Sequence, residues 1–238
     1  MPVFDRLPVA DQAELLGHVQ VFLAEKSFEG AGGLTLTDEI RITIAAQACM
    51  LLLHRETDYY PQLTSIIVYP SGYTSSEDRF IGGGIWEEGG EARLGHTARE
   101  LRAMVLAWDV AKRGAADPDD GRNLVLHEFA HQLDFENYLA DGTPALDTPT
   151  AYRAWGRVMS AELQALRRAS NAGLATVLDN YGATDPAEFF AVATEAFFEQ
   201  PAALAASHPA LFSEMKNFFR QDPTTYSQGV REAPHTDS

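Results

Sequence analysis

The stretch of the sequence most clearly suited to chemistry is His127-Glu128-Phe129-Ala130-His131, in which a glutamate follows the first of two histidines. On a helix, residues four apart lie on one face, so both imidazoles can bind one Zn²⁺ at about 2.0–2.1 Å. Glu128 projects about 100° around the axis from His127, which leaves it near water on the open side of the metal. The pattern indicates a metallohydrolase with Glu128 as general base, and the alternative is a structural pair of histidines.

A catalytic zinc site needs a third protein ligand beside an open fourth position. One extended form of the motif has a histidine six residues after His131, but residue 137 is asparagine. Asp134, on the same helix, is expected to accept the other ring N–H of a ligating histidine. The remaining source is a glutamate on a separate helix, and the candidates are Glu162, Glu188, Glu195, Glu199 and Glu214.

Glu188 and Glu195 differ from the other candidates because Phe and Ala flank them, and their spacing of seven residues places them on one helix face. Glu188 also has a purely structural interpretation. Asp185-Pro186-Ala187-Glu188 is typical of a helix start, with Glu188 at the third helical position of a capping box. The spacing alone leaves both interpretations of Glu188 open.

Hydrophobic periodicity and turn signals predict the elements that position these residues. The predicted helices cover residues 11–26, 38–55, 122–136, 149–169 and 185–199, and the last helical turns begin at Pro201 or Pro209 and end near residue 220. Short strands are predicted at 65–69 and 103–108. A loop or hairpin is predicted at 80–91, and a polar segment at 112–114 closes the second strand. We expect an α+β fold, mostly helical, with a small sheet beside the helix that carries the histidines.

We expect the chain to form one domain over residues 1–238. Its predicted parts are an N-terminal helical part (1–57), a catalytic core (58–225) and a flexible tail (226–238). The length of 238 residues and the 45% hydrophobic content are those of a globular protein with a substantial core.

Charge and cysteine content exclude several classes of protein. A formal net charge of −16 repels phosphate backbones and anionic lipid, so direct binding of nucleic acid is not expected. Cys49 is the single cysteine, so an internal disulfide cannot form. The first residues lack the pattern of a secretory signal, and no stretch approaches the about 18 apolar residues of a membrane span. These features predict a cytoplasmic protein without membrane contact.

Three segments resemble the Mlc titration factor A family of glucose-regulated zinc metallopeptidases, whose catalytic core is similar to that of anthrax lethal factor. They are MVLAWDVAKRG (104–114), NLVLHEFAHQLDFENYLADGTPAL (123–146) and YGATDPAEFFAVATEAFFEQP (181–201). The resemblance covers about residues 59–226, and the N-terminal helices match only in character. Where family members often have two acidic residues after the tryptophan of the short strand, this chain has Asp109-Val110.

The resemblance implies a zincin-like metallopeptidase with one Zn²⁺ per chain, bound by His127, His131 and Glu188. It implies Glu128 as the base and Tyr181 as an active-site tyrosine that helps to stabilise the tetrahedral oxyanion. The implied activity is aminopeptidase-like hydrolysis of a peptide or protein substrate.

A second hypothesis comes from the same resemblance, because family members bind the glucose repressor Mlc in the cytoplasm. In that case the chain sequesters a transcriptional repressor of the Mlc type, and its zinc is chiefly structural. Glu128 and the lack of a Cys or His near Glu188 to close the fourth metal position favour the enzyme.

Overall fold

Two of the three N-terminal helices form where the hydrophobic spacing predicts them, but the helix predicted over 38–55 ends at Met50, and the first short helix was not predicted. The computed structural model describes residues 1–71, 78–80, 86–88 and 102–228. A short helix, α1 (Pro2–Arg6), precedes α2 (Val9–Glu25) and α3 (Asp38–Met50). Thr37 caps α3, because its hydroxyl accepts a hydrogen bond from the Ile40 N–H at 3.3 Å. Phe22 of α2 and Ile44 of α3 are fully buried where the two helices pack together.

Three parallel strands form the main sheet in the order β1-β2-β5. β1 (Ser27–Gly30) pairs with β2 (Ser65–Tyr69), and β2 pairs with β5 (Ala103–Ala107) so that Ser65 lies opposite Ala103. The sequence pattern did not predict β1, because the edge segment Ser-Phe-Glu-Gly has no β-branched residue.

A separate antiparallel pair is formed by β3 (Asp78–Phe80) and β4 (Trp86–Glu88). This pair agrees with the loop or hairpin predicted at 80–91, although residues 81–85 and 89–91 lie outside the described residues.

A polar segment was predicted at 112–114, after the strand that is now β5, and this prediction is wrong. Helix α5 (Trp108–Ala116) begins directly after β5 instead. Lys112 and Arg113 are exposed on α5, whereas Ala111 and Gly114 are buried. The charged residues therefore mark the solvent face of an amphipathic helix. The next elements are α6 (Leu124–Asp134) and the short η1 (Phe135–Asn137).

The C-terminal half is helical. Its elements are α7 (Pro149–Asn171), η2 (Asn180–Ala183), α8 (Pro186–Glu199), α9 (Pro201–Ser207), α10 (Pro209–Phe219) and η3 (Pro223–Gln228). Four of these helices begin with proline, which suits the first helical position because its missing N–H has no partner there.

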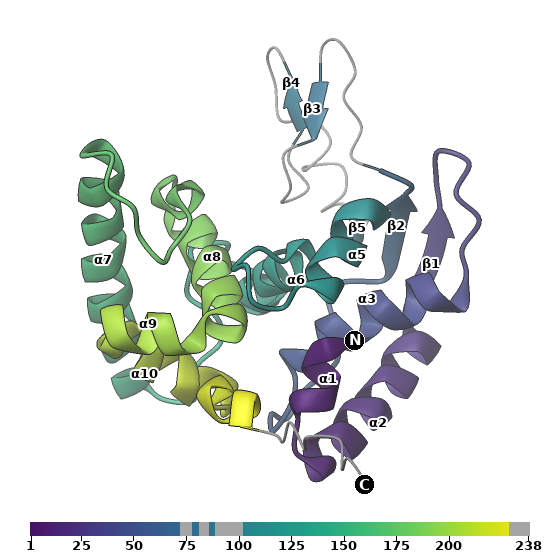
Figure 1. The fold of residues 1–238 in the computed structure, drawn as a ribbon, viewed down its shortest axis with the longest axis horizontal. Helices are drawn as coiled ribbons and strands as arrows, with labels where there is room; N and C mark the ends of the chain where they lie inside the picture. Colours follow the sequence, from purple (N-terminus) through teal and green to yellow (C-terminus); the bar gives the residue numbers. More distant parts are fainter. Residues whose placement is uncertain (72–77, 81–85, 89–101, 229–238) are drawn as a thin grey trace, which may run out of the picture.

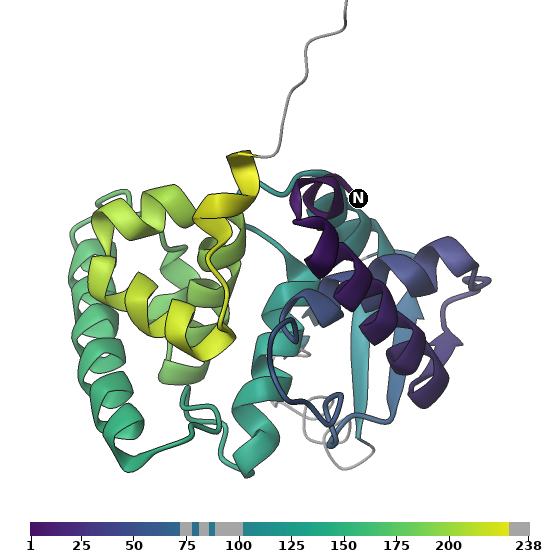
Figure 2. The same ribbon diagram turned by 90° about the horizontal axis from the view of Figure 1, so that it is seen from below.

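Helix α6 lies between the two halves of the molecule. Figures 1 and 2 show α7–α10 on one side of it and the main sheet with α2 and α3 on the other. α6 packs against α8, α3 and β5, so the small sheet lies beside the histidine helix, and the predicted α+β class is confirmed. Within the described residues, no helix has both the length and the apolar character needed to cross a bilayer.

The last described residues, 226–228, belong to the folded structure and not to a tail. Residues 226–228 of the segment predicted as a tail belong to η3. Tyr226 is buried, and its hydroxyl donates a hydrogen bond to Oε1 of Gln221 at 2.9 Å. The rest of the predicted tail, residues 229–238, lies outside the described residues.

Candidate metal centre

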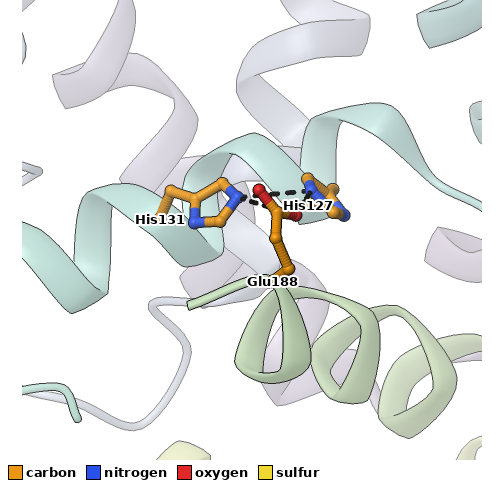
Figure 3. A group of neighbouring side chains, drawn as sticks. All are labelled: His127, His131 and Glu188. Atoms are coloured by element: carbon orange, nitrogen blue, oxygen red, sulfur yellow. Dashed lines mark hydrogen bonds and ion pairs between the residues drawn. The ribbon is translucent and has the colours of Figure 1, made fainter. Parts of the chain in front are cut away.

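The orientation of α6 is fixed by its cap and by its apolar side. Oδ1 of Asn123 accepts hydrogen bonds from the N–H groups of Val125 and Leu126, both at 3.1 Å. Phe129 and Leu133 are fully buried. These constraints set the rotation of α6 about its axis, and Figure 3 shows the two histidines of the helix directed toward Glu188 of α8.

The start of α8 positions Glu188. Oδ1 of Asp185 accepts the N–H groups of Ala187 at 2.9 Å and of Glu188 at 3.0 Å, so Asp185 caps the helix with its own side chain. The carboxylate of Glu188 instead lies against the imidazoles of His127 and His131 (Figure 3).

Three atoms with metal-binding chemistry converge between α6 and α8. Nε2 of His127 lies 3.1 Å from Oε2 of Glu188 and 3.3 Å from Nε2 of His131. Nε2 of His131 lies 3.6 Å from the same Glu188 oxygen. In a tetrahedral site with bonds of about 2.0–2.1 Å, ligand atoms are about 3.3–3.4 Å apart. The three atoms therefore have separations close to those of one face of a zinc tetrahedron.

The hydrogen bonds of His127 show that this site calls for a cation. Nδ1 of His127 lies 2.7 Å from Oε1 of Glu195, so the proton of a neutral ring belongs on Nδ1. Nε2 then directs a lone pair at the Glu188 carboxylate, which is also an acceptor. Only a second proton or a metal ion between them makes this contact favourable.

The pKa values of His127 and Glu188 also indicate that a positive charge belongs between these two side chains. Burial lowers the pKa of His127, but its hydrogen bonds to Glu188 and Glu195 outweigh burial and raise it well above the ordinary value. Burial raises the pKa of Glu188, but hydrogen bonds from His127 and His131 outweigh burial and hold it at about 2. Glu188 is therefore ionised, and the donor set fits a divalent metal.

Asp134 is expected from the sequence to accept the ring N–H of a ligating histidine, and this expectation is wrong. Its Oδ2 accepts the Gly142 N–H at 2.9 Å, and its Oδ1 is buried without a hydrogen-bond partner. Glu195 takes that position, two turns after Glu188 on the same face of α8. Oε2 of Glu195 also accepts the Asn123 N–H at 2.5 Å, so one carboxylate orients both the His127 ring and the start of α6.

Glu128 and Tyr181 complete the set of residues expected at the site. Glu128 is 4% exposed and directly follows His127 on α6. Tyr181 lies in η2, with its ring centroid 6.1 Å from that of His127. Burial, followed by the charges of Glu188 and Glu128, raises the pKa of Tyr181 well above its ordinary value. The phenol is therefore protonated and able to donate a hydrogen bond.

Comparison with known proteins decides the family. Residues 1–220 match the glucose-regulated metallo-peptidase M90 family. The chain belongs to this family. It is 35% identical to the uncharacterized protein slr2042 of Synechocystis sp. over 94% of this chain and 81% of the relative. Membership of M90 confirms the family resemblance and the zincin-like α+β fold, and it implies a divalent metal.

Other relatives carry a functional name. The chain is 28% identical to Mlc titration factor A of Salmonella gallinarum, over 94% of this chain and 84% of that protein. It is 29% identical to Mlc titration factor A of Serratia proteamaculans, over 97% of this chain and 88% of that protein. These similarities extend through nearly the whole chain.

Gly142 lies where the start of α8 leaves no room for a side chain. Its φ is +76°, and a Cβ there would lie 2.2 Å from the carbonyl oxygen of Pro186. Gly142 also donates its N–H to Asp134 and accepts a hydrogen bond from Nε1 of Trp155 at 2.9 Å. The loop is therefore fixed between the end of α6 and the start of α8.

We expect Gly142→Ala to lower the free energy of unfolding by about 2–4 kcal/mol, because strain and a backbone collision add together. Gly173→Ala is the matched control, since Gly173 has a φ of +65° but open space around it. That change costs about 1 kcal/mol of backbone strain alone. Denaturant unfolding of both variants measures the difference, and equal losses would contradict the proposed collision.

Glu199, the last residue of α8, is a buried acid that titrates near neutral pH. Burial raises its pKa to about 8, although the hydrogen bond from Nδ2 of Asn123 acts in the opposite direction. The folded chain therefore holds a proton on Glu199 at pH values where the unfolded chain has lost it. Because Glu199 ionises between about pH 4.5 and about pH 8 only in the unfolded chain, stability falls as pH rises through this range.

Glu199→Gln mimics the protonated acid and removes this loss. We expect the variant to match the parent protein at pH 4.5 and to exceed it by about 2–4 kcal/mol of unfolding free energy at pH 8.5. Urea unfolding of both proteins at the two pH values measures the change. A variant less stable than the parent at pH 8.5 would show that the carboxylate is stabilising instead.

Proposed function

We propose that the protein is a zinc-dependent peptidase of aminopeptidase-like activity, with His127, His131 and Glu188 as the zinc ligands. The observation that carries the proposal is the convergence of three donor atoms, 3.1–3.6 Å apart, from two packed helices. Membership of a metallopeptidase family supports it. Two imidazoles with one carboxylate suit zinc, whereas Mg²⁺ and Ca²⁺ prefer sites made of oxygen ligands.

Each residue has a distinct part in the proposed hydrolysis. Zinc bound at this site supplies a Lewis acid and lowers the pKa of water to about 7. Glu128 accepts the proton of the attacking water and delivers it to the leaving amine. Tyr181 donates its phenolic hydrogen bond to the oxyanion of the tetrahedral intermediate. Glu195 positions the His127 ring through Nδ1 and thereby keeps Nε2 directed at the site.

Metal removal tests the proposal. We expect the chain to contain one zinc per molecule by elemental analysis, and a chelator to abolish hydrolysis of aminoacyl p-nitroanilides. One equivalent of Zn²⁺ restores the rate, and Mg²⁺ does not. A parallel unfolding measurement on the chelated protein checks that its fold is retained. Full activity in protein from which all metal has been removed would refute the proposal.

A second candidate function is the binding of a transcriptional repressor of the Mlc type. The observation that favours it is the name of the Salmonella and Serratia relatives, Mlc titration factor A. The two functions are compatible, because a protein surface that binds a repressor can lie outside the candidate metal centre. Both are proposed for the cytoplasm, where such a repressor acts.

A further inference from the structure

A cavity of about 310 Å³ lies where the chain after α3 meets α7 and α10, and it shares no residue with the candidate metal centre. Its apolar wall includes Leu146, Trp155 and Phe218. Its charged groups are the guanidinium groups of Arg55 and Arg220 and the carboxylates of Glu56, Asp147 and Glu214. The volume is at the lower end of the range for ligand sites, which limits an occupant to a small molecule.

Arg55 lines this cavity, and one of its donors is buried without a hydrogen-bond partner. Its Cζ lies 4.1 Å from the centre of the Phe218 ring, so an aromatic face covers the guanidinium plane. Nη1 is buried and has no hydrogen-bond partner, and the described part of the chain offers no carboxylate within 4.0 Å of this guanidinium. Glu136 is near enough to act on Arg55 electrostatically but forms no ion pair with it. Asp147 of the same cavity also acts on Arg55 without forming an ion pair with it. A largely covered charge without a direct partner is costly, so an anionic group that enters the cavity beside Arg55 would be stabilised there.

Arg220 adds a second guanidinium to the same cavity. It ends α10 with a φ of +54°, and its Nη2 lies 3.3 Å from Oδ2 of Asp147. This ion pair is exposed, and it uses one of the five N–H donors of Arg220. Donors therefore remain on both arginines for a carboxylate, which matches the planar fork of a guanidinium.

The three carboxylates at the cavity determine which anion fits. A multiply charged anion such as phosphate is repelled by Glu56, Asp147 and Glu214. A ligand that carries an ammonium group beside its carboxylate is attracted by both sets of charges. Leu146 is half-buried and, beside the largely covered Phe218 ring, offers an apolar surface for an uncharged side chain. An α-amino acid, free or at the end of a short peptide, has all three features.

We propose that this cavity binds the zwitterion of an apolar amino acid or short peptide. Arg55 and Arg220 hold the carboxylate, the acidic residues of the cavity face the ammonium group, and the side chain packs against Leu146 and Phe218. The proposal does not depend on metal or on hydrolysis, because no residue of the candidate metal centre takes part.

Isothermal titration calorimetry with L-leucine tests the proposal, using the zinc-loaded Glu128→Gln protein so that peptides can be compared as well. We expect one leucine per chain and at least a tenfold loss of affinity in Arg55→Met. The matched control is Arg157→Met, at an exposed position of α7 outside the cavity, which leaves the affinity unchanged. N-acetyl-leucine, which lacks the ammonium group, and leucinol, which lacks the carboxylate, bind at least tenfold more weakly.

Further measurements separate the proposal from its alternatives. Tighter binding of glycyl-leucine than of leucine indicates a peptide as the natural ligand, and the reverse indicates a free amino acid. Without ligand, Arg55→Met keeps or raises the melting temperature, because it removes an unpaired buried charge. The proposal is overturned if neither leucine nor glycyl-leucine binds, if Arg55→Met leaves the affinity unchanged, or if inorganic phosphate binds more tightly than leucine. It is also overturned if Arg55→Met melts earlier than the parent protein.

Discussion

Replacing Glu128 by glutamine is expected to lower the rate of peptide hydrolysis by about 10²–10⁴-fold, because the amide keeps the shape of the side chain but cannot accept a proton. The zinc content is expected to stay at one per chain, since Glu128 is not among the three converging ligand residues. Turnover of an aminoacyl p-nitroanilide and elemental analysis of the same sample measure both quantities. Glu162→Gln, on α7, is the matched control and leaves the rate unchanged.

The same Glu128 variant separates the two candidate functions. If the chain acts as a peptidase, the parent protein hydrolyses the substrate and the variant does not. If it acts chiefly by binding a repressor of the Mlc type, parent and variant bind that repressor equally well and the parent shows no turnover. Loss of zinc from the variant would instead show that Glu128 has been assigned the wrong role.

Glu188→Gln is expected to lower zinc affinity by more than about 100-fold, because the neutral amide loses the charge that binds the metal. Glu195→Gln is the control on the same face of α8. It weakens the hydrogen bond to His127, a proposed zinc ligand, for which the expected loss is about 10–100-fold. Competition against a chromophoric chelator measures both affinities.

The fold of the metal-free Glu188 variant provides a second control. Asp185 caps α8 through its own side chain, so Glu188→Gln should change the free energy of unfolding by at most about 1 kcal/mol. Unchanged zinc affinity in Glu188→Gln together with a large loss in Glu195→Gln would transfer the ligand role to Glu195. That outcome would contradict the role implied by the family.

Local sequence determines the parts of this site that lie within one helix. The spacing of His127 and His131 places both imidazoles on one face of α6, because a helix repeats every 3.6 residues. The sequence of α8 is less informative, since Asp185 and Glu188 occur at the same positions whether Glu188 caps the helix or faces a metal. Spacing cannot separate these alternatives. They differ only in what lies opposite α8.

Tertiary contacts determine the features that sequence reasoning missed. Asp134 is close to His131 along the chain, yet Glu195 accepts the His127 proton because α8 packs along α6. The apolar neighbours of Glu195 and its spacing of seven residues from Glu188 are the signals that the sequence offers. β1 went unrecognised for a related reason, because its parallel partner, β2, is more than 30 residues away and β1 has no strand-forming pattern of its own.

Anomalous diffraction at the zinc edge, from crystals of protein purified without added metal, shows directly whether zinc lies between α6 and α8. We predict one strong peak per chain, bonded to Nε2 of His127, Nε2 of His131 and a carboxylate oxygen of Glu188. Among the described residues, the other group able to hold a metal is Asp11, Glu14 and His54, and it is more exposed. A peak at that group with none between α6 and α8, or no peak after soaking with zinc, would refute the proposed ligand set.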